Sequence, residues 1–478
     1  MENGLQKESG VQAFWLDAKA RFGFKSTREP LPRNDPFYGC NSTVEELKKG
    51  DYSPGALLRK RGIYLTDFID FDADEMIGWQ MAYITRGQDA KDDVMVTVAT
   101  IVIPPNAGAR DKIVFQMPKT DSANSNSRTS YMLRRGSGSI AGAASEQIFM
   151  IDFLKRGYIV VVVDYEGQFD AFGAGPTAGH GALDAMRAIL SFDELKLAPK
   201  DQLKFVGWGY SGGAIAISWA AQMLESYASD LQPYIKGWSC GGVPKDLKQV
   251  AYHVNNGLAA GLIIGVMQGL ANINKTLNDW LQANTNEYGK KALEVAKTES
   301  FWDFMPQNAF KDILNMVPGG TGKDAGYFTV EGDALSPPPP KEALEFNQLA
   351  LEFTKTKDKK LIPKVPIFLY ERIPDEVVPI AIIDDLVDLW SSNGAIIQYT
   401  RVKVWMHVGA IFAMQSQNVA WIADRMDGKP IEAKDAYKKD LDTNIDDKES
   451  EAVLGKERCG SLAKFYNTIY GKPKRVWW

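Results

Sequence analysis

The chain has 478 residues, more than one hydrophobic core usually supports, so we expect two domains or one large domain with an inserted cap. A formal net charge of −5 gives no indication of a nucleic-acid partner or of an anionic membrane surface. The three cysteines (Cys40, Cys240 and Cys459) are too widely spaced for a metal-ligand cluster or an obvious disulfide framework, so we expect no metal and no cofactor.

The N-terminal segment lacks the basic start and apolar run of a secretory signal. We therefore expect a cytoplasmic protein, or a secreted one if a leader has been removed. Residues 1–75 are expected to form an irregular lead-in with a short helix near residues 11–22. Runs of β-branched residues then predict strands at 81–85, 94–103 and 112–116, and a polar loop follows at 118–127.

From about residue 144 the pattern alternates between helices and strands. The predicted elements are a helix at 144–156, a strand at 158–164, a helix at 179–195, strands at 203–208 and 236–242, and a helix after residue 211. Such alternation predicts βαβ units, hence an α/β fold with a mostly parallel central sheet and helices on both faces. Ligands bind at the carboxyl ends of the strands in sheets of this kind.

One of these strand ends carries the motif Gly209-Tyr210-Ser211-Gly212-Gly213. A G-x-S-x-G between a strand and a helix is typical of a nucleophilic serine on a strained turn, where small neighbours let the strand and the helix pass closely. The start of the helix offers backbone N–H groups to an anion that forms beside the serine. Ser211 is therefore the predicted nucleophile, although a serine can also be an ordinary turn residue.

The alternation stops between residues 244 and 335, where helical segments predict a cap. Glycines recur there at every fourth position: Gly257, Gly261, Gly265 and Gly269. The apolar run that contains them is shorter than the ~20 residues needed to span a bilayer. We therefore favour a cap helix packed closely on the body, with no stable membrane insertion.

A stiff connector at Pro337–340 returns the chain to the main domain. Further predicted elements are a strand at 365–370, a helix at 381–392, a strand at 396–404 and a helix at 411–426, before a charged tail of uncertain structure. The predicted division is a lead-in (1–75), a core in two parts (76–243 and 336–426), a cap (244–335) and a tail or flap (427–478).

A nucleophilic serine needs a histidine base, and the chain contains three histidines. In this architecture the order is nucleophile, acid, histidine, which excludes His180. His253 follows the serine, but no strand-end acid precedes it. His407 follows the strand at 396–404 and is therefore the predicted base.

The acid is expected in the loop after the strand at 365–370, where Glu371, Asp375 and Glu376 are candidates. Glu371 still belongs to the strand, whereas Asp375 lies in the middle of the loop. We choose Asp375, with Glu376 as the alternative. An oxyanion site needs two donors: the backbone N–H of Gly212 is one, and the loop at 118–127 is expected to supply the other. Tyr210 is a weaker candidate for substrate contact.

Several segments resemble the fungal secretory lipase family, the lipase A type of α/β-hydrolase. They are the runs at 164–167, 171–172, 179–184, 209–214, 241–244, 375–379 and 407–430, in family order. The resemblance implies an α/β-hydrolase fold with a helical lid, and Ser211, Asp375 and His407 as the triad. It also implies Asp121 as an oxyanion donor, which requires a protonated carboxyl group with a raised pKa.

The chain departs from the family pattern at several points. Family members are usually exported and disulfide-bonded, whereas no cysteine lies near Ser127 or in the insert. Glu371-Arg372 replaces the usual His-Gly, and residues 117–121 form an atypical loop. These differences put triglyceride specificity in doubt, and the chain equally resembles intracellular relatives of fungal secondary metabolism that remove or move acyl groups.

We expect a serine carboxylic-ester hydrolase that acts through an acyl-enzyme on an apolar, small-molecule ester. An acyltransferase would use the same residues, with an alcohol in place of water. A lyase or cyclase could use the serine and histidine for proton transfer. A catalytically silent binding protein is the remaining alternative, because a fold does not prove a function.

Overall fold

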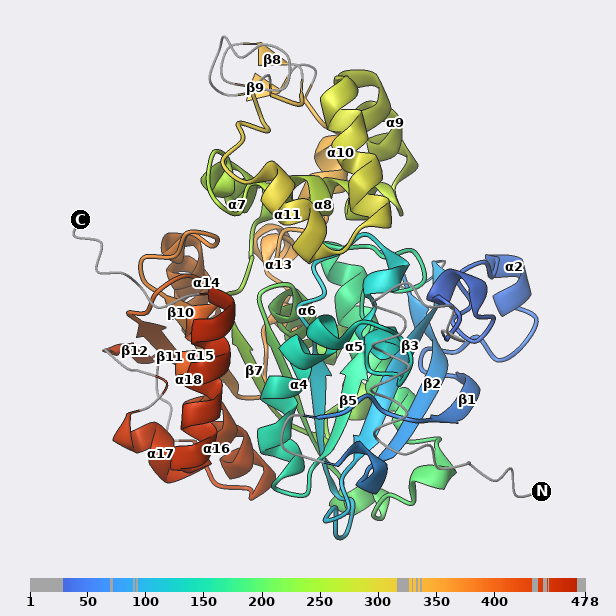
Figure 1. Ribbon diagram of the computed structural model, residues 1–478, viewed down its shortest axis with the longest axis vertical. Helices are drawn as coiled ribbons and strands as arrows, with labels where there is room; N and C mark the ends of the chain where they lie inside the picture. Colours follow the sequence, from blue (N-terminus) through green and yellow to red (C-terminus); the bar gives the residue numbers. More distant parts are fainter. Residues whose placement is uncertain are drawn as a thin grey trace.

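The computed structural model describes residues 29–68, 72–88, 91, 93–315, 326–328, 330–331, 334–335, 338–431, 437–441, 445 and 447–470. The helix expected near residues 11–22 lies outside these ranges. A ten-stranded sheet in the order β1-β2-β3-β5-β4-β6-β7-β10-β11-β12 forms the centre (Figure 1). Its strands are β1 (Leu57–Ile63), β2 (Ile77–Arg86), β3 (Val94–Ile103), β4 (Lys112–Met117), β5 (Ile159–Val163), β6 (Lys204–Tyr210), β7 (Ile235–Gly241), β10 (Ile367–Arg372), β11 (Ile397–Val402) and β12 (Tyr437–Leu441).

Seven neighbouring strands of this sheet, from β5 to β12, run parallel. The first three strands pair antiparallel with one another, and β3 pairs antiparallel with β5. The predicted mostly parallel sheet is therefore confirmed. Because β4, β6, β10 and β11 are parallel, the loops that follow them come out at the same edge.

Helices cover both faces of the sheet. The larger ones are α4 (Ile140–Leu154), α5 (Gly175–Ile189), α6 (Gly212–Tyr227), α14 (Ile380–Ser392), α16 (Gln415–Met426) and α18 (Lys456–Tyr470). Strand β5 shows why both faces must be covered: Ile159, Val161 and Val163 belong to the core cluster that contains α5, α6 and α14, whereas Val160 and Val162 belong to the cluster that contains α4, α16 and α18. A strand that is apolar at every position can be buried only in this way.

The C-terminal tail differs most from the expectation. It adds β12 to the sheet edge and contributes α17 (Lys448–Leu454) and α18, which lies beside α15 (Gly409–Ala413) and α16 (Figure 1). Tyr466 of α18 packs on Phe412 of α15, with ring centroids 5.2 Å apart. Arg458 forms a buried ion pair with Asp152 of α4 at 2.7 Å. These contacts with residues far away in the sequence stabilise the helices of the tail, whose own sequence pattern predicts helix only weakly.

The helix predicted at 411–426 is two helices, α15 and α16, because the chain leaves helical geometry at Met414, where ψ is 0°. Strand β1 was not predicted either. The short helices of the core are α2 (Val44–Leu47), α3 (Thr129–Met132), α12 (Lys341–Glu345) and α13 (Leu351–Thr356).

The predicted cap region contains α7 (Leu247–Val254), α8 (Gly261–Ala271), α9 (Lys275–Asn284), α10 (Glu287–Thr298) and α11 (Phe301–Asn308), with a small hairpin of β8 (Val330–Glu331) and β9 (Ala334–Leu335). In Figure 1 these elements lie together at one end of the molecule, beyond the sheet. Among the described helices, none is long and apolar enough to cross a membrane.

The glycines of α8 bring this helix close to the body, as their spacing predicts. A Cβ on Gly269 would lie 2.4 Å from the carbonyl oxygen of Phe172 and 2.5 Å from its backbone nitrogen. A Cβ on Gly265 would lie 3.3 Å from the Phe172 ring. Only a helix face without side chains can approach another backbone so closely.

We predict that Gly269→Ala destabilises the protein by about 1–3 kcal/mol, since the added methyl group must displace backbone atoms. This cost exceeds the ~1 kcal/mol that alanine gains over glycine inside a helix. A thermal melt would show a Tm lower by a few degrees. Gly460→Ala in α18 is the matched control, because its Cβ meets nothing within 4 Å and its Tm should stay equal or rise. Equal Tm changes in the two variants would contradict the packing argument.

Candidate active site

Ser211 occupies the turn between β6 and α6 in a strained backbone conformation. Its φ of 54° and ψ of −117° lie in a region that residues with a Cβ rarely adopt. Such strain costs of order 1–3 kcal/mol and persists only where the surroundings enforce it. Ser211 lines a large cavity.

The glycines around Ser211 are required by close backbone contacts. A Cβ on Gly209 would lie 2.4 Å from the carbonyl oxygen of Gly213, and one on Gly213 would lie 2.0 Å from the carbonyl oxygen of Met117 in β4. A Cβ on Gly212 would lie 1.9 Å from Oδ1 of Asp121. The motif therefore packs α6 against two strands and brings the Asp121 carboxyl group to the start of the helix.

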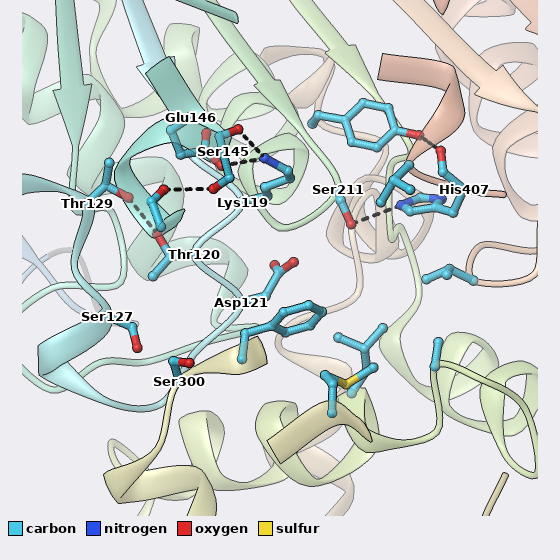
Figure 2. A pocket seen from close by; sticks show the side chains of 18 of the residues that line it. Lys119, Thr120, Asp121, Ser127, Thr129, Ser145, Glu146, Ser211, Ser300 and His407 are labelled. Atoms are coloured by element: carbon cyan, nitrogen blue, oxygen red, sulfur yellow. Dashed lines mark hydrogen bonds and ion pairs between the residues drawn. The ribbon is translucent and has the colours of Figure 1, made fainter. Parts of the chain in front are cut away.

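Three residues from distant parts of the chain form one hydrogen-bonded row at this edge of the sheet. The hydroxyl of Ser211 lies 3.0 Å from Nε2 of His407, and Nδ1 of His407 lies 2.8 Å from Oδ2 of Asp375 (Figure 2 shows the first of these contacts). Asp375 follows β10 and His407 follows β11, as expected. The geometry is that of a nucleophile, a base and an orienting acid.

The electrostatics of His407 and Asp375 match this arrangement. Burial of the His407 ring favours the neutral imidazole, but the adjacent Asp375 carboxylate outweighs burial and raises the pKa of His407 above its ordinary value. Burial also opposes the charged form of Asp375, yet its pKa is lowered because His407 and the N–H groups of Val377 and Val378 stabilise the carboxylate. Asp375 therefore stabilises the imidazolium that forms when the neutral His407 ring takes a proton.

The other two acidic candidates hold the backbone instead of the ring. Glu376 accepts a hydrogen bond from the backbone N–H of His407 at 2.6 Å and pairs with Arg372 at 2.9 Å. Glu371 accepts one from the backbone N–H of Val243 at 2.7 Å. Burial, reinforced by the Asp375 charge, raises the pKa of Glu371 to about 8. A sequence pattern does not distinguish these roles, because all three carboxylates lie within six positions.

Asp121 lines the same cavity and lies, in the view of Figure 2, between Ser211 and the polar residues Thr120 and Ser127. Its side chain is buried, its φ is 48°, and its Oδ1 has no hydrogen-bond partner among the described residues. Burial raises the pKa of Asp121 to about 7, although Lys119 acts in the opposite direction. A protonated carboxyl group at this position could donate a hydrogen bond to an oxyanion beside the N–H of Gly212.

Tyr210 also lines the cavity, but its hydroxyl donates a hydrogen bond to the carbonyl oxygen of His407 at 2.6 Å. That hydroxyl is therefore engaged in holding the histidine loop, and substrate contact by Tyr210 stays a prediction. His180 is buried and contacts the carbonyl oxygen of Gly87 at 2.8 Å. His253 of α7 contacts the carbonyl oxygen of Asp375 at 2.8 Å and so joins the cap to the acid loop.

The cavity has a volume of about 650 Å³ and reaches from Ser211 to the cap. Residues of the cap region form its apolar wall: Leu258, Ala259, Leu262, Phe301, Met305, Pro306 and Ala309. The sequence did not predict these contacts, because apolar side chains at helical spacing predict a buried face without saying what it covers.

Comparison with known proteins places the chain among lipases. Residues 137–433 match the model of a family described as "Secretory lipase". The secreted triacylglycerol lipase LIP5 of Malassezia globosa is 30% identical over 465 residues, which cover 94% of this chain and 90% of that protein. The secreted triacylglycerol lipase LIP3 of Malassezia restricta is 29% identical over 411 residues, which cover 85% and 82% of the two chains.

The fold has a close counterpart among solved structures. Lipase A of Candida antarctica in its closed state superposes with a TM-score of 0.77 at 22% identity, over 94% of this chain and 99% of that one. This likeness supports the α/β-hydrolase fold. The expectation of a cytoplasmic protein is wrong, because the relatives are named as secreted lipases. An N-terminal sequence pattern was not sufficient evidence of location.

We predict that His407 and His180 titrate far apart in an NMR pH titration. His407 should have its midpoint above 6.5, since Asp375 stabilises the imidazolium, and His180 should have it at about 4, because burial disfavours its charged form. In Asp375→Asn the midpoint of His407 should move to lower pH while that of His180 stays in place. A His407 midpoint that does not respond to this substitution would contradict the pairing.

Proposed function

The chain belongs to the secretory lipase family, and on this premise we propose that Ser211, His407 and Asp375 carry out its chemistry. The protein is a serine carboxylic-ester hydrolase that acts on apolar esters. The observation that carries the residue assignment is the continuous row of hydrogen bonds, 3.0 Å and 2.8 Å long, from the Ser211 hydroxyl through His407 to Asp375.

In the first half of the reaction, Oγ of Ser211 attacks the ester carbonyl carbon while Nε2 of His407 takes the hydroxyl proton. Asp375 keeps Nδ1 of His407 protonated and stabilises the imidazolium. The C–O bond of the tetrahedral intermediate then breaks, and His407 passes its proton to the departing alcohol. An acyl-enzyme on Ser211 remains.

In the second half, a water molecule gives a proton to His407 and attacks the acyl-enzyme carbonyl. The second tetrahedral intermediate collapses, the acid leaves, and the proton returns from His407 to Oγ of Ser211. Each intermediate carries a negative oxygen that needs hydrogen-bond donors placed in advance. We assign this role to the backbone N–H of Gly212 and to the protonated carboxyl group of Asp121.

We further propose that the protein acts outside the cell. Relatives of similar length are named as secreted triacylglycerol lipases, and the apolar cap wall suits long acyl chains. Acyl transfer would require an alcohol to reach the acyl-enzyme in place of water, whereas the relatives are named as lipases, which are hydrolases. Hydrolysis is therefore the function that we put forward.

We predict that Ser211→Ala lowers kcat for a p-nitrophenyl ester by roughly 10⁶, the scale seen when a triad serine is removed. Labelling with a fluorophosphonate probe should disappear in the same variant. Ser218→Ala is the matched control, because its hydroxyl lies in α6 and bonds only to backbone carbonyl groups of that helix. Full turnover by Ser211→Ala would reject the assignment.

We predict that the Asp121 carboxyl group contributes a loss of activity as the pH rises through its pKa of about 7, set against the gain as His407, whose pKa is also raised, loses its proton and becomes a base. Below this pH the carboxyl group is protonated and can donate to the oxyanion, and above it the donor is lost. In Asp121→Asn the amide donates at every pH, so the activity of this variant relative to the wild type should rise as the pH rises through about 7. Asp121→Ala should lower kcat by about 10²–10³ below this pH and by less above it, where the wild-type donor is already lost. An unchanged pH–rate profile in Asp121→Asn would exclude this role.

A further inference from the structure

The cavity beside Ser211 has two chemically different walls. The cap supplies hydrocarbon, whereas the loop after β4 and the start of α4 supply polar side chains. Figure 2 shows Lys119, Thr120, Ser127, Thr129 and Glu146 on one side of Asp121, and Ser211 with His407 on the other. A substrate that reaches from Ser211 past Asp121 therefore meets this polar wall along one edge.

Two atoms of the polar wall lack the partners that buried polar atoms normally have. Oγ of Ser127 and Oδ1 of Asn126 make no hydrogen bond to any described residue, and Ser127 is only 7% exposed. An unsatisfied buried polar atom costs free energy unless a ligand or a water molecule pairs with it. Both residues line the cavity, although these two oxygen atoms are themselves covered, so a side-chain rotation would bring either of them to a bound molecule.

A buried ion pair adds charge to the same wall. Nζ of Lys119 lies 2.6 Å from Oε1 of Glu146 and 3.0 Å from the carbonyl oxygen of Ser145. The Lys119 and Glu146 side chains are 11% and 5% exposed. An ammonium group has three N–H donors, and these two contacts with described residues leave one for a further acceptor.

We propose that this wall is a hydroxyl-binding subsite, and that the ester substrate carries one or more hydroxyl groups in the part that lies beyond Asp121. The proposal rests on the hydrolase function put forward above and names its substrate class. A hydroxyl group fits the wall because it both donates and accepts. It can donate to Oδ1 of Asn126 and accept from Lys119 or from the Ser127 hydroxyl.

A plain hydrocarbon chain fits this wall poorly. It offers neither a donor nor an acceptor, so the unpaired oxygen atoms of Asn126 and Ser127 and the remaining N–H group of Lys119 would stay unpaired beside it. Sites built to pair with a substrate hydroxyl therefore discriminate against analogues that lack it. The opposite cap wall, with Leu258, Leu262 and Phe301, still accepts an apolar edge of the same molecule.

The test compares esters that differ only in hydroxyl groups. For the acyl side, the pair is p-nitrophenyl hexanoate and p-nitrophenyl 6-hydroxyhexanoate. For the alcohol side, it is hexyl hexanoate and glycerol monohexanoate. We expect kcat/KM to be about tenfold higher for the hydroxylated member of at least one pair, the scale of one net hydrogen bond. The pair that shows the preference identifies the side of the ester that occupies the subsite.

Ser127→Ala should remove most of this preference, partly by raising kcat/KM for the plain ester, because no unpaired hydroxyl group then faces its chain. A Tm equal to that of the wild type would show that the variant folds. Ser122→Ala is the matched control. Its hydroxyl is likewise buried and without a partner among the described residues, and it lies in the same loop, but it does not line the cavity. The preference should persist in this control.

Equal kcat/KM values within both pairs would overturn the subsite, as would a preference that survives in Ser127→Ala. These outcomes differ from a failure of the proposed function. If the plain ester is hydrolysed and Ser211→Ala abolishes its turnover, the triad stands and only the subsite falls. If Ser211→Ala retains turnover, the triad itself is wrong.

Discussion

The position of the His407 ring is the constraint on which the rest of the site depends. Both ring nitrogens are committed, one towards Ser211 and the other to Asp375, so the ring cannot turn without losing a contact. Its backbone is held as well, since Glu376 accepts from its N–H and Tyr210 donates to its carbonyl oxygen. Four contacts from two loops and a strand end therefore fix one imidazole, which is the preorganisation that acid–base catalysis requires.

The close packing at this edge of the sheet depends on glycines, which have no side chain. Gly209 and Gly213 let α6 approach β6 and β4, and Gly212 leaves room for the carboxyl group of Asp121. That group is kept from water, which is why its pKa is raised. The close packing of α6 and the raised pKa of Asp121 thus both depend on the glycines of this turn. A larger residue at Gly212 would occupy the space that the carboxyl group fills.

Much of the fold and of the candidate site could be predicted from the sequence, and the features that could not be predicted have identifiable physical reasons. The strand-helix alternation and the G-x-S-x-G motif are local signals, so they gave the parallel sheet and the serine turn. Chain order selected His407 among three histidines. The tail was missed because α18 depends on distant partners such as Asp152. The different positions of Glu371, Asp375 and Glu376 were also beyond sequence patterns, because a shift of one residue in a loop redirects a side chain completely.

The contact between His253 and the carbonyl oxygen of Asp375 has a mechanical consequence. A movement of helix α7 away from the body would have to break this hydrogen bond or displace the loop that carries Asp375. The position of this helix and the alignment of Asp375 with His407 are therefore coupled through one hydrogen bond.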